Sequence, residues 1–83
     1  MTNIYVGNLP YTASTDDLRG LFEEYGSVRF ARVITDRDTG RSKGFGFVEM
    51  NDDDAASNAI GALNGSDYMG RPLRVNESRP RER

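Results

Sequence analysis

The residue types most able to do chemistry in this chain lie between residues 43 and 50, in the run KGFGFVEM. The mixture of aromatic and apolar side chains predicts a β-strand, in which successive side chains point to opposite faces. One face would then carry Lys43, Phe45 and Phe47, and the other Gly44, Gly46, Val48 and Met50. If the second face covers the core, two aromatic rings and a cation remain outside. Such a surface suits a planar ligand, and nucleobases are planar ligands.

A third aromatic side chain is expected beside these two, from near the start of the chain. Residues 4–9 read IYVGNL and predict another strand, with Ile4 and Val6 facing the core and Tyr5 facing out. The two glycines in the first run are costly inside a strand unless another element approaches closely, and we expect a packed helix there. Together the two strands would present three aromatic rings on one surface.

The composition excludes much of enzyme chemistry. The chain has neither cysteine nor histidine, so it lacks disulfides, thiolate metal sites and the usual pairs of nucleophile and base. We therefore expect a protein that is not an enzyme and that holds no metal and no cofactor. Asp52, Asp53 and Asp54 resemble calcium ligands, but the spacing and distal glutamate of an EF-hand loop are missing. We interpret this triplet as a helix start, where acidic groups favour the positive end of the helix dipole.

Length and hydropathy limit the organisation of the chain. Eighty-three residues are enough for one small domain and leave no room for a second core. The first residues do not follow the pattern of a signal peptide, and no apolar run approaches the ~20 residues of a membrane span. We expect a soluble, cytoplasmic protein that does not associate with a membrane. Nothing in the sequence requires more than a monomer.

The charges are unevenly distributed along the chain. The net charge is −2, which taken alone argues against a nucleic-acid ligand. Acidic residues predominate in segments 1–28 and 51–70, whereas segments 29–50 and 71–83 hold most of the basic residues. The first two segments are expected to be mainly helical, and the other two to form strands and a tail. A fold with an acidic helical side and a cationic sheet side would orient a polyanion before contact. The alternative is that these are ordinary solvated surface charges.

Hydrophobic periodicity and turn signals predict the order of the elements. Strands are expected at 3–8, 28–35, 43–50 and 72–76, and helices at 14–26 and 52–64. In the last strand, which begins at Pro72, Leu73 and Val75 point inward and Arg74 and Asn76 outward. This order predicts an α+β fold of the ferredoxin-like βαββαβ type. In that fold two helices cover one face of a four-stranded antiparallel sheet and leave the other face open.

Local signals mark several element ends. Ser14 and Asp17 form a capping box, and Gly26 is expected to end the first helix in a left-handed conformation. Asn64 and Gly65 are expected to end the second helix. A phase shift near Phe30 and Ala31 predicts a bulge in the second strand, beyond which Ala31 and Val33 point inward. Residues 36–42 contain turn residues and basic side chains, and we expect a hairpin loop beside the aromatic surface.

Two signatures give this sequence a family resemblance. Residues 43–50 match the RNA-recognition signature R/K-G-F/Y-G/A-F-V-x-F/Y at seven of eight positions, with Met50 as the exception. Met50 is expected to face the core, where methionine packs adaptably. Residues 4–9, 36–42 and 70–75 also resemble the family. The sequence is therefore similar to the RNA-recognition motif (RRM) family, and most of all to small single-RRM proteins of bacteria and cyanobacteria and to the RRM of plant glycine-rich RNA-binding proteins.

The resemblance implies an RRM over residues 1–78 and an arginine-rich disordered tail over 79–83. It also implies that single-stranded RNA crosses the open face of the sheet, with a role in post-transcriptional regulation or RNA chaperoning. Tyr5 and Phe47 would each stack on a base, and Phe45 would pack against sugars. The other implied RNA-binding groups are basic or polar: Lys43, Arg41, Arg32, Arg74, Asn76, the backbone of Glu77 and Ser78, and Arg79.

Three alternatives stay open beside this interpretation. Single-stranded DNA could be accepted as well as RNA. Some RRM-like domains bind peptides on the same sheet, so a protein-interaction module is the main alternative function. A small hydrolase of the acylphosphatase type also has this topology, but the sequence has no segment that could form its phosphate loop. Tyr11, Phe22 and Tyr25 are interpreted as packing residues and not as ligand contacts.

Overall fold

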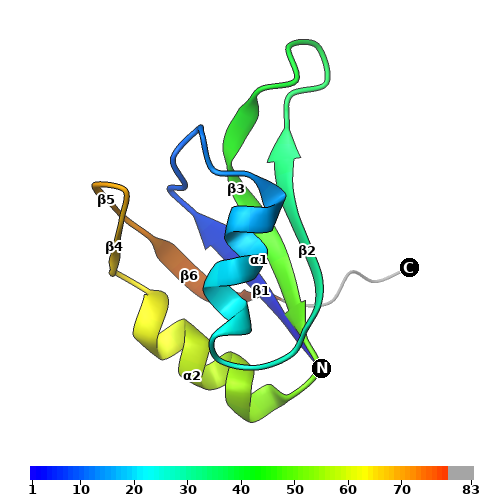
Figure 1. Cartoon of the computed structure of the whole chain (residues 1–83), viewed down its shortest axis with the longest axis vertical. Coiled ribbons are helices and arrows are strands. Elements are labelled where there is room, and N and C mark those ends of the chain that lie inside the picture. Colours follow the sequence, from blue (N-terminus) through cyan, green and yellow to red (C-terminus); the bar gives the residue numbers. More distant parts are fainter. Residues whose placement is uncertain (79–83) are drawn as a thin grey trace.

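A computed structural model describes residues 1–78 of the chain, and its elements follow the predicted order with one addition (Figure 1). The elements are β1 (Thr2–Gly7), α1 (Thr15–Glu23), β2 (Val28–Thr35), β3 (Ser42–Met50), α2 (Asp53–Leu63), β4 (Asp67–Tyr68), β5 (Arg71–Pro72) and β6 (Arg74–Ser78). Strands β2, β3, β1 and β6 lie side by side in that order, and each neighbouring pair is antiparallel. Helix α1 packs against β2 and β3, and α2 packs against β6 and β1. The predicted α+β fold is therefore confirmed, and β4 and β5 form an additional short hairpin.

The core lies between the two helices and the inner face of the sheet. The side chains that are almost completely buried include Ile4, Val6, Leu18, Phe22, Val48, Met50, Leu73 and Val75. Met50 is thus an inward-facing residue, as predicted. The register between β2 and β3 slips between Val28 and Phe30, which confirms the predicted bulge. Ala31 and Val33, beyond the bulge, are buried as expected.

Helix α1 begins at the predicted capping box. The Ser14 hydroxyl accepts a hydrogen bond from the Asp17 N–H (3.1 Å), and the Asp17 carboxylate accepts one from the Ser14 N–H (3.0 Å). The predicted end of the helix is wrong, because Glu23 is its last residue and Gly26 has no left-handed backbone. A Cβ at Gly26 would lie 2.7 Å from the Ala55 Cβ. Gly26 therefore allows α2 to approach closely.

Helix α2 begins at the acidic triplet, as predicted. Asp52 is its N-cap, and the carboxylate accepts hydrogen bonds from the N–H groups of Asp54 (2.8 Å) and Ala55 (3.4 Å). Small apolar residues dominate its buried side, which consists of Ala55, Ala56, Ala59 and Leu63. Gly65 follows with a φ of 83°, which confirms the predicted stop. Neither helix of the described chain is long and apolar enough to cross a membrane.

The two glycines of β3 have different roles. A Cβ at Gly46 would lie 2.5 Å from the Arg32 carbonyl oxygen and 2.9 Å from Leu18 Cδ2. Because Leu18 belongs to α1, the expected close approach of a helix is confirmed at Gly46. The same expectation is wrong at Gly44, whose nearest neighbours belong to Tyr11 and Leu9. Gly44 has a φ of 85° and lies where the register between β2 and β3 slips a second time, so it accommodates a bend in the strand.

The last strand begins later than the sequence predicts. Pro72 belongs to the short strand β5, and β6 begins at Arg74. The turn between β4 and β5 has positive φ at Met69 (52°) and Gly70 (86°), which is the geometry of a two-residue hairpin turn. Pro72, which was expected to begin the last strand, pairs with β4 instead.

Candidate nucleic-acid interface

Three aromatic rings cluster on the face of the sheet opposite the helices. Tyr5 on β1 lies directly opposite Phe47 on β3, and their ring centroids are 5.9 Å apart in an edge-on arrangement. The Phe45 ring lies 6.0 Å from each of the other two. These are distances of favourable aromatic pairs, so the rings hold one another in position. All three residues are only half-buried, and we name their outward surface the aromatic face.

The strand register places polar side chains on both sides of the aromatic face. Arg32 on β2 lies opposite Phe47, and Asn76 on β6 lies opposite Tyr5. Directly opposite residues of antiparallel strands point to the same face. One row across the sheet therefore consists entirely of predicted site residues, with the cation at one end and the amide at the other.

Gly7 shapes the aromatic face, although nothing in the sequence marks it for that role. It lies opposite Phe45 on one side and Arg74 on the other. A Cβ at Gly7 would lie 2.5 Å from the Tyr5 hydroxyl oxygen and 2.8 Å from Tyr5 Cε2. The Tyr5 ring therefore leans over Gly7, toward the row that contains Phe45 and Arg74. A larger residue at this position would push the ring away.

A fourth aromatic side chain, Phe30, extends the same face toward the edge formed by β2. It is 42% exposed and lies opposite Glu49, which in turn lies opposite Asn3. The sequence does not assign Phe30 to the site, because the bulge beside it obscures which way the ring points. The pairing with Glu49 places the Phe30 ring on the open face, because Glu49 is two residues after Phe47 in β3 and points the same way. Glu49 also forms an ion pair with Arg29 (3.7 Å), which offsets its negative charge.

Asn3 adds an unpaired acceptor to this row. Its side-chain oxygen is buried and has no hydrogen-bond partner among the described residues. A buried acceptor without a partner is unfavourable, and a ligand that donates a hydrogen bond would relieve the cost. Asn3 precedes the apolar strand residues and was not among the predicted site residues; the sequence offers no signal beyond its alternation with Tyr5.

The hairpin between β2 and β3 carries Arg41 and Lys43, both exposed, to one end of the sheet. Asp36 fixes the turn, because its carboxylate accepts hydrogen bonds from the N–H groups of Asp38 (2.7 Å) and Thr39 (3.3 Å). These bonds hold the pKa of Asp36 below its ordinary value of 3.8. The ionised carboxylate therefore helps to position the loop that carries the two cations.

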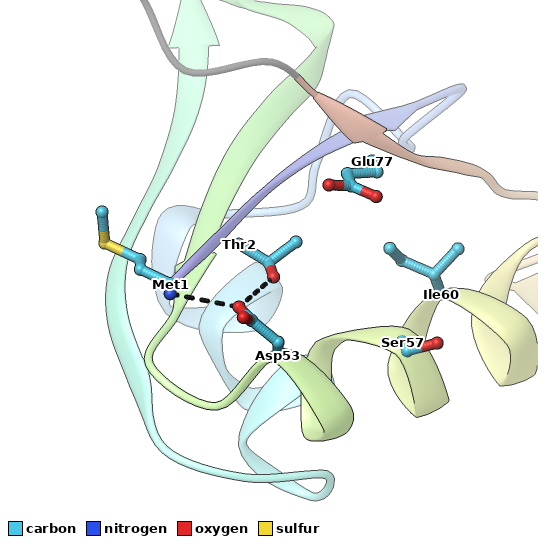
Figure 2. A pocket seen from close by; sticks show the side chains of 6 residues that line it. All are labelled: Met1, Thr2, Asp53, Ser57, Ile60 and Glu77. Carbon is cyan, nitrogen blue, oxygen red and sulfur yellow. Dashed lines mark hydrogen bonds and ion pairs between the residues drawn. The ribbon is translucent and has the colours of Figure 1, made fainter.

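Glu77 points away from the open face. It lies opposite Ile4, a core residue, so its side chain is on the helical side of the sheet. There it lines a cleft of about 420 Å³ together with Met1, Thr2, Asp53, Ser57 and Ile60 (Figure 2). Its backbone, and not its carboxylate, remains the candidate ligand group. Ser78 lies opposite Asn3, on the open face, whereas Arg79 lies outside the described residues.

The cleft in Figure 2 is acidic and distinct from the aromatic face. Asp53 accepts a hydrogen bond from the Thr2 hydroxyl (2.6 Å) and lies 3.1 Å from the Met1 amine. The Thr2 hydrogen bond and the hydrogen bond and charge of the amine hold the pKa of Asp53 below its ordinary value of 3.8. With Glu77 also present, this cleft does not suit an anionic ligand.

The sequence profile of the family described as the RNA recognition motif matches residues 4–74. This chain belongs to the RNA recognition motif family. Its relatives include RbpE of Nostoc sp., whose name assigns RNA binding provisionally. RbpE is 56% identical over 80 residues, which are 96% of this chain and 81% of RbpE. The chloroplast 28 kDa ribonucleoprotein of Spinacia oleracea is 52% identical over 80 residues, which are 94% of this chain and 34% of that protein. The predicted resemblance is confirmed.

Solved protein structures agree with this fold over nearly the whole chain. The crystal structure of RNA binding protein PG1 has a TM-score of 0.95 and 53% identity, with 100% of both chains covered. A complex of the Sxl-lethal protein with RNA has a TM-score of 0.88 and 40% identity, and covers 93% of this chain and 47% of that one. The match in fold therefore includes a protein that was solved in complex with RNA.

This RRM brings most of the predicted site residues to one surface. The open face holds Tyr5, Phe45, Phe47, Arg32, Arg74 and Asn76, and its end at the hairpin holds Arg41 and Lys43. Phe22 is fully buried and Tyr25 packs against the core, as predicted. Tyr11 is not a packing residue: 66% of it is exposed, so that interpretation is wrong.

Proposed function

We propose that this RRM binds single-stranded RNA across the open face of its sheet. The observation that carries the proposal is the aromatic face, where three rings lie within 6.0 Å of one another on the side opposite the helices. Clustered rings exposed to water are unfavourable unless a ligand covers them, and unpaired bases stack well on such rings. Relatives named for RNA binding, and a protein of similar fold that was solved in complex with RNA, support the same conclusion.

The aromatic side chains supply affinity in this proposal. Tyr5 and Phe47 each stack on one base, and Phe45 packs against the sugars between them. Because Tyr5 and Phe47 lie directly opposite on neighbouring strands, successive nucleotides of one RNA strand can reach both rings. Each stacked base contributes ~1–3 kcal/mol and the identity of the base matters little. Selectivity must then come from polar groups.

The polar groups around the aromatic face supply selectivity and charge. Arg32 and Asn76 flank the stacked bases and can form hydrogen bonds with base edges. Arg74 and the backbone of Glu77 and Ser78 line the β6 side. Lys43 and Arg41 attract phosphates at the hairpin end, and Arg79 is proposed to do the same beyond β6.

The proposal also covers catalysis, oligomeric state, location in the cell and cellular role. We propose that the protein acts by binding and not by catalysis, as a monomer in the cytoplasm, in post-transcriptional regulation or RNA chaperoning. The lack of cysteine and histidine in the sequence supports a binding role. Sedimentation of the purified protein tests the monomer, and a fluorescent fusion tests the location in the cell.

A titration followed by NMR tests RNA binding. Isotope-labelled protein is mixed with random-sequence single-stranded RNA of about eight nucleotides, with each homopolymer, and with the matching single-stranded DNA, at low and moderate salt. Shifts centred on Tyr5, Phe45, Phe47, Arg32 and Asn76 that weaken with salt are expected. The homopolymers rank base preference, and the DNA arm separates the two nucleic acids.

Variants make the titration specific to the aromatic face. Phe47→Ala and Tyr5→Ala should each lower RNA affinity by roughly 5- to 150-fold, with amide spectra that remain those of a folded protein. Arg19→Ala is a control on the helical side, since Arg19 pairs with Glu23 there, and should change affinity little. Retained affinity in a folded Phe47→Ala variant, or no RNA binding at any salt concentration, would sink the proposal and leave the peptide-binding alternative.

A further inference from the structure

We propose that Tyr11, Arg41 and Arg71 form a second nucleotide-binding subsite beside the aromatic face. This inference rests on the proposed RNA binding and extends it to a longer strand. The structural basis is a cleft of about 480 Å³ between the loop that follows β1 and the hairpin that joins β2 to β3. Tyr11, Gly40, Arg41 and Ser42 line this cleft.

Tyr11 is held in an exposed position by its neighbours in the chain. Leu9 is buried, and its N–H donates to the Gly44 carbonyl (2.9 Å). The Ala13 N–H donates to the Pro10 carbonyl (3.0 Å), which closes a turn around Tyr11. Buried residues on both sides thus anchor the backbone, while 66% of Tyr11 itself stays exposed. An aromatic ring presented in this way is available for stacking.

Arg71 restrains the Tyr11 ring by lying over it. Its guanidinium carbon lies 5.7 Å from the centroid of the Tyr11 ring, within the range of a cation–π contact. Arg71 is itself fixed, because its Nη2 donates to the Asn8 side-chain oxygen (3.0 Å), and the Asn8 amide donates to the Pro72 carbonyl (2.6 Å). A ring already held in place loses little conformational freedom when a base stacks on it.

The charge of the cleft suits a nucleotide. Arg41 lines it, and Arg71 lies over the ring that forms one of its walls. The nearby Asp36 carboxylate accepts hydrogen bonds from the N–H groups of Asp38 and Thr39 in the hairpin. A stacking ring with guanidinium groups around it matches a base joined to a phosphate, because planar guanidinium groups bind phosphate oxygens in pairs.

The position of the cleft connects it to the aromatic face. A Cβ at Gly44 would lie 3.3 Å from Tyr11 Cε1, so the Tyr11 ring lies beside the residue that immediately precedes Phe45. A strand that passes over Phe45 and leaves the sheet at this end is therefore directed toward the cleft. Short RNAs would occupy the aromatic face alone, and longer ones both sites.

RNA length separates the two sites in a binding experiment. Affinities of random-sequence pools of about three and about eight nucleotides are measured by fluorescence anisotropy for the wild type, Tyr11→Leu and Tyr11→Phe. Tyr11→Leu should weaken binding of the long pool by roughly 5- to 150-fold and leave the short pool within about twofold. Tyr11→Phe keeps the ring and should bind both pools like the wild type.

Two arginines of one loop provide the matched control. Arg37 and Arg41 are both exposed in the hairpin, but Arg41 lines the cleft and Arg37 does not. Arg41→Ala should weaken the long pool clearly more than Arg37→Ala does, whereas a general effect of charge would make the two variants equal and overturn the role of Arg41. Amide spectra check that every variant is folded.

The outcomes distinguish this inference from the proposed function. If Phe47→Ala loses affinity while Tyr11→Leu binds both pools like the wild type, the second subsite is wrong and RNA binding on the sheet stands. An equal loss for both pools in Tyr11→Leu would also overturn the subsite, since the residue would then act through the sheet. If the wild type binds neither pool, both proposals fail together.

Discussion

Replacing Gly46 with alanine tests whether close packing beneath the aromatic face stabilises the fold. The added methyl group would lie 2.5 Å from the Arg32 carbonyl oxygen, 2.9 Å from Leu18 Cδ2 and 3.1 Å from the Val33 Cα. Two of these atoms belong to the backbone of β2, which pairs with Gly46 in the sheet. Leu18 is fully buried, and close packing in a protein interior makes a change of its rotamer costly. Either β3 must move away from β2, or α1 must lift from the sheet.

The expected loss of stability follows from these contacts. Forcing an extra methyl group into a packed core costs about 1–3 kcal/mol, and more in some cases. Gly46→Ala should fall in the upper part of that range, about 2–3 kcal/mol, because a change of side-chain rotamer cannot relieve a clash with backbone atoms. For a domain of this size the melting temperature would fall by roughly 8–24 °C. Urea unfolding followed by circular dichroism should show a lower midpoint with an unchanged m-value.

Gly61→Ala is the matched control for this substitution. Gly61 lies in α2, and a Cβ there would meet nothing within 4 Å. Alanine should therefore raise the free energy of unfolding by about 0.5–1 kcal/mol, because glycine is unfavourable inside a helix. If Gly46→Ala were as stable as the wild type within about 0.5 kcal/mol, the packing argument would be refuted.

One titration and two substitutions give three further predictions. An NMR titration of the Asp36 carboxyl should give a pKa below 3.8 because of its bonds to backbone N–H groups. Since the folded pKa is the lower one, its contribution to stability is complete above the ordinary value and is lost as the pH falls through the folded value; an unshifted pKa would contradict those bonds. Ser14→Ala should lower the free energy of unfolding by about 0.5–2 kcal/mol in urea, and no loss would mean that the capping box contributes nothing. Phe30→Leu should weaken binding of eight-nucleotide RNA about fivefold or more in anisotropy measurements, and equal affinity would show that no base stacks on Phe30.

Features with a local cause could be predicted from the sequence. The capping box at Ser14 and Asp17 and the N-cap at Asp52 depend on residues two or three positions apart, so the sequence contains both partners. The alternation along β3 places Met50 in the core and Phe47 outside for the same reason. Together these signals were enough to predict the order of the elements and the presence of the aromatic face.

Features that depend on distant segments could not be predicted in this way. Gly26 resembles a helix stop, but its structural role is to leave room for Ala55 on the other helix. Tyr11 resembles a packing residue until the hairpin and Arg71 are placed around it. The side of the sheet on which Phe30 lies depends on a bulge whose length only the pairing with β3 defines. In each case the missing information is which segments lie side by side.

The placement of charge explains how a chain with a net charge of −2 can offer a site for a polyanion. Among the described residues that the register turns toward the open face, Arg32 and Arg74 are cations, and the acidic residue Glu49 forms an ion pair with Arg29. The acidic triplet begins α2, and Glu77 turns to the helical side. Charges on the far side are screened by salt over about 8 Å at physiological ionic strength. RNA at the sheet therefore meets the charge of one face, and the net charge of the whole chain is a poor guide to the ligand.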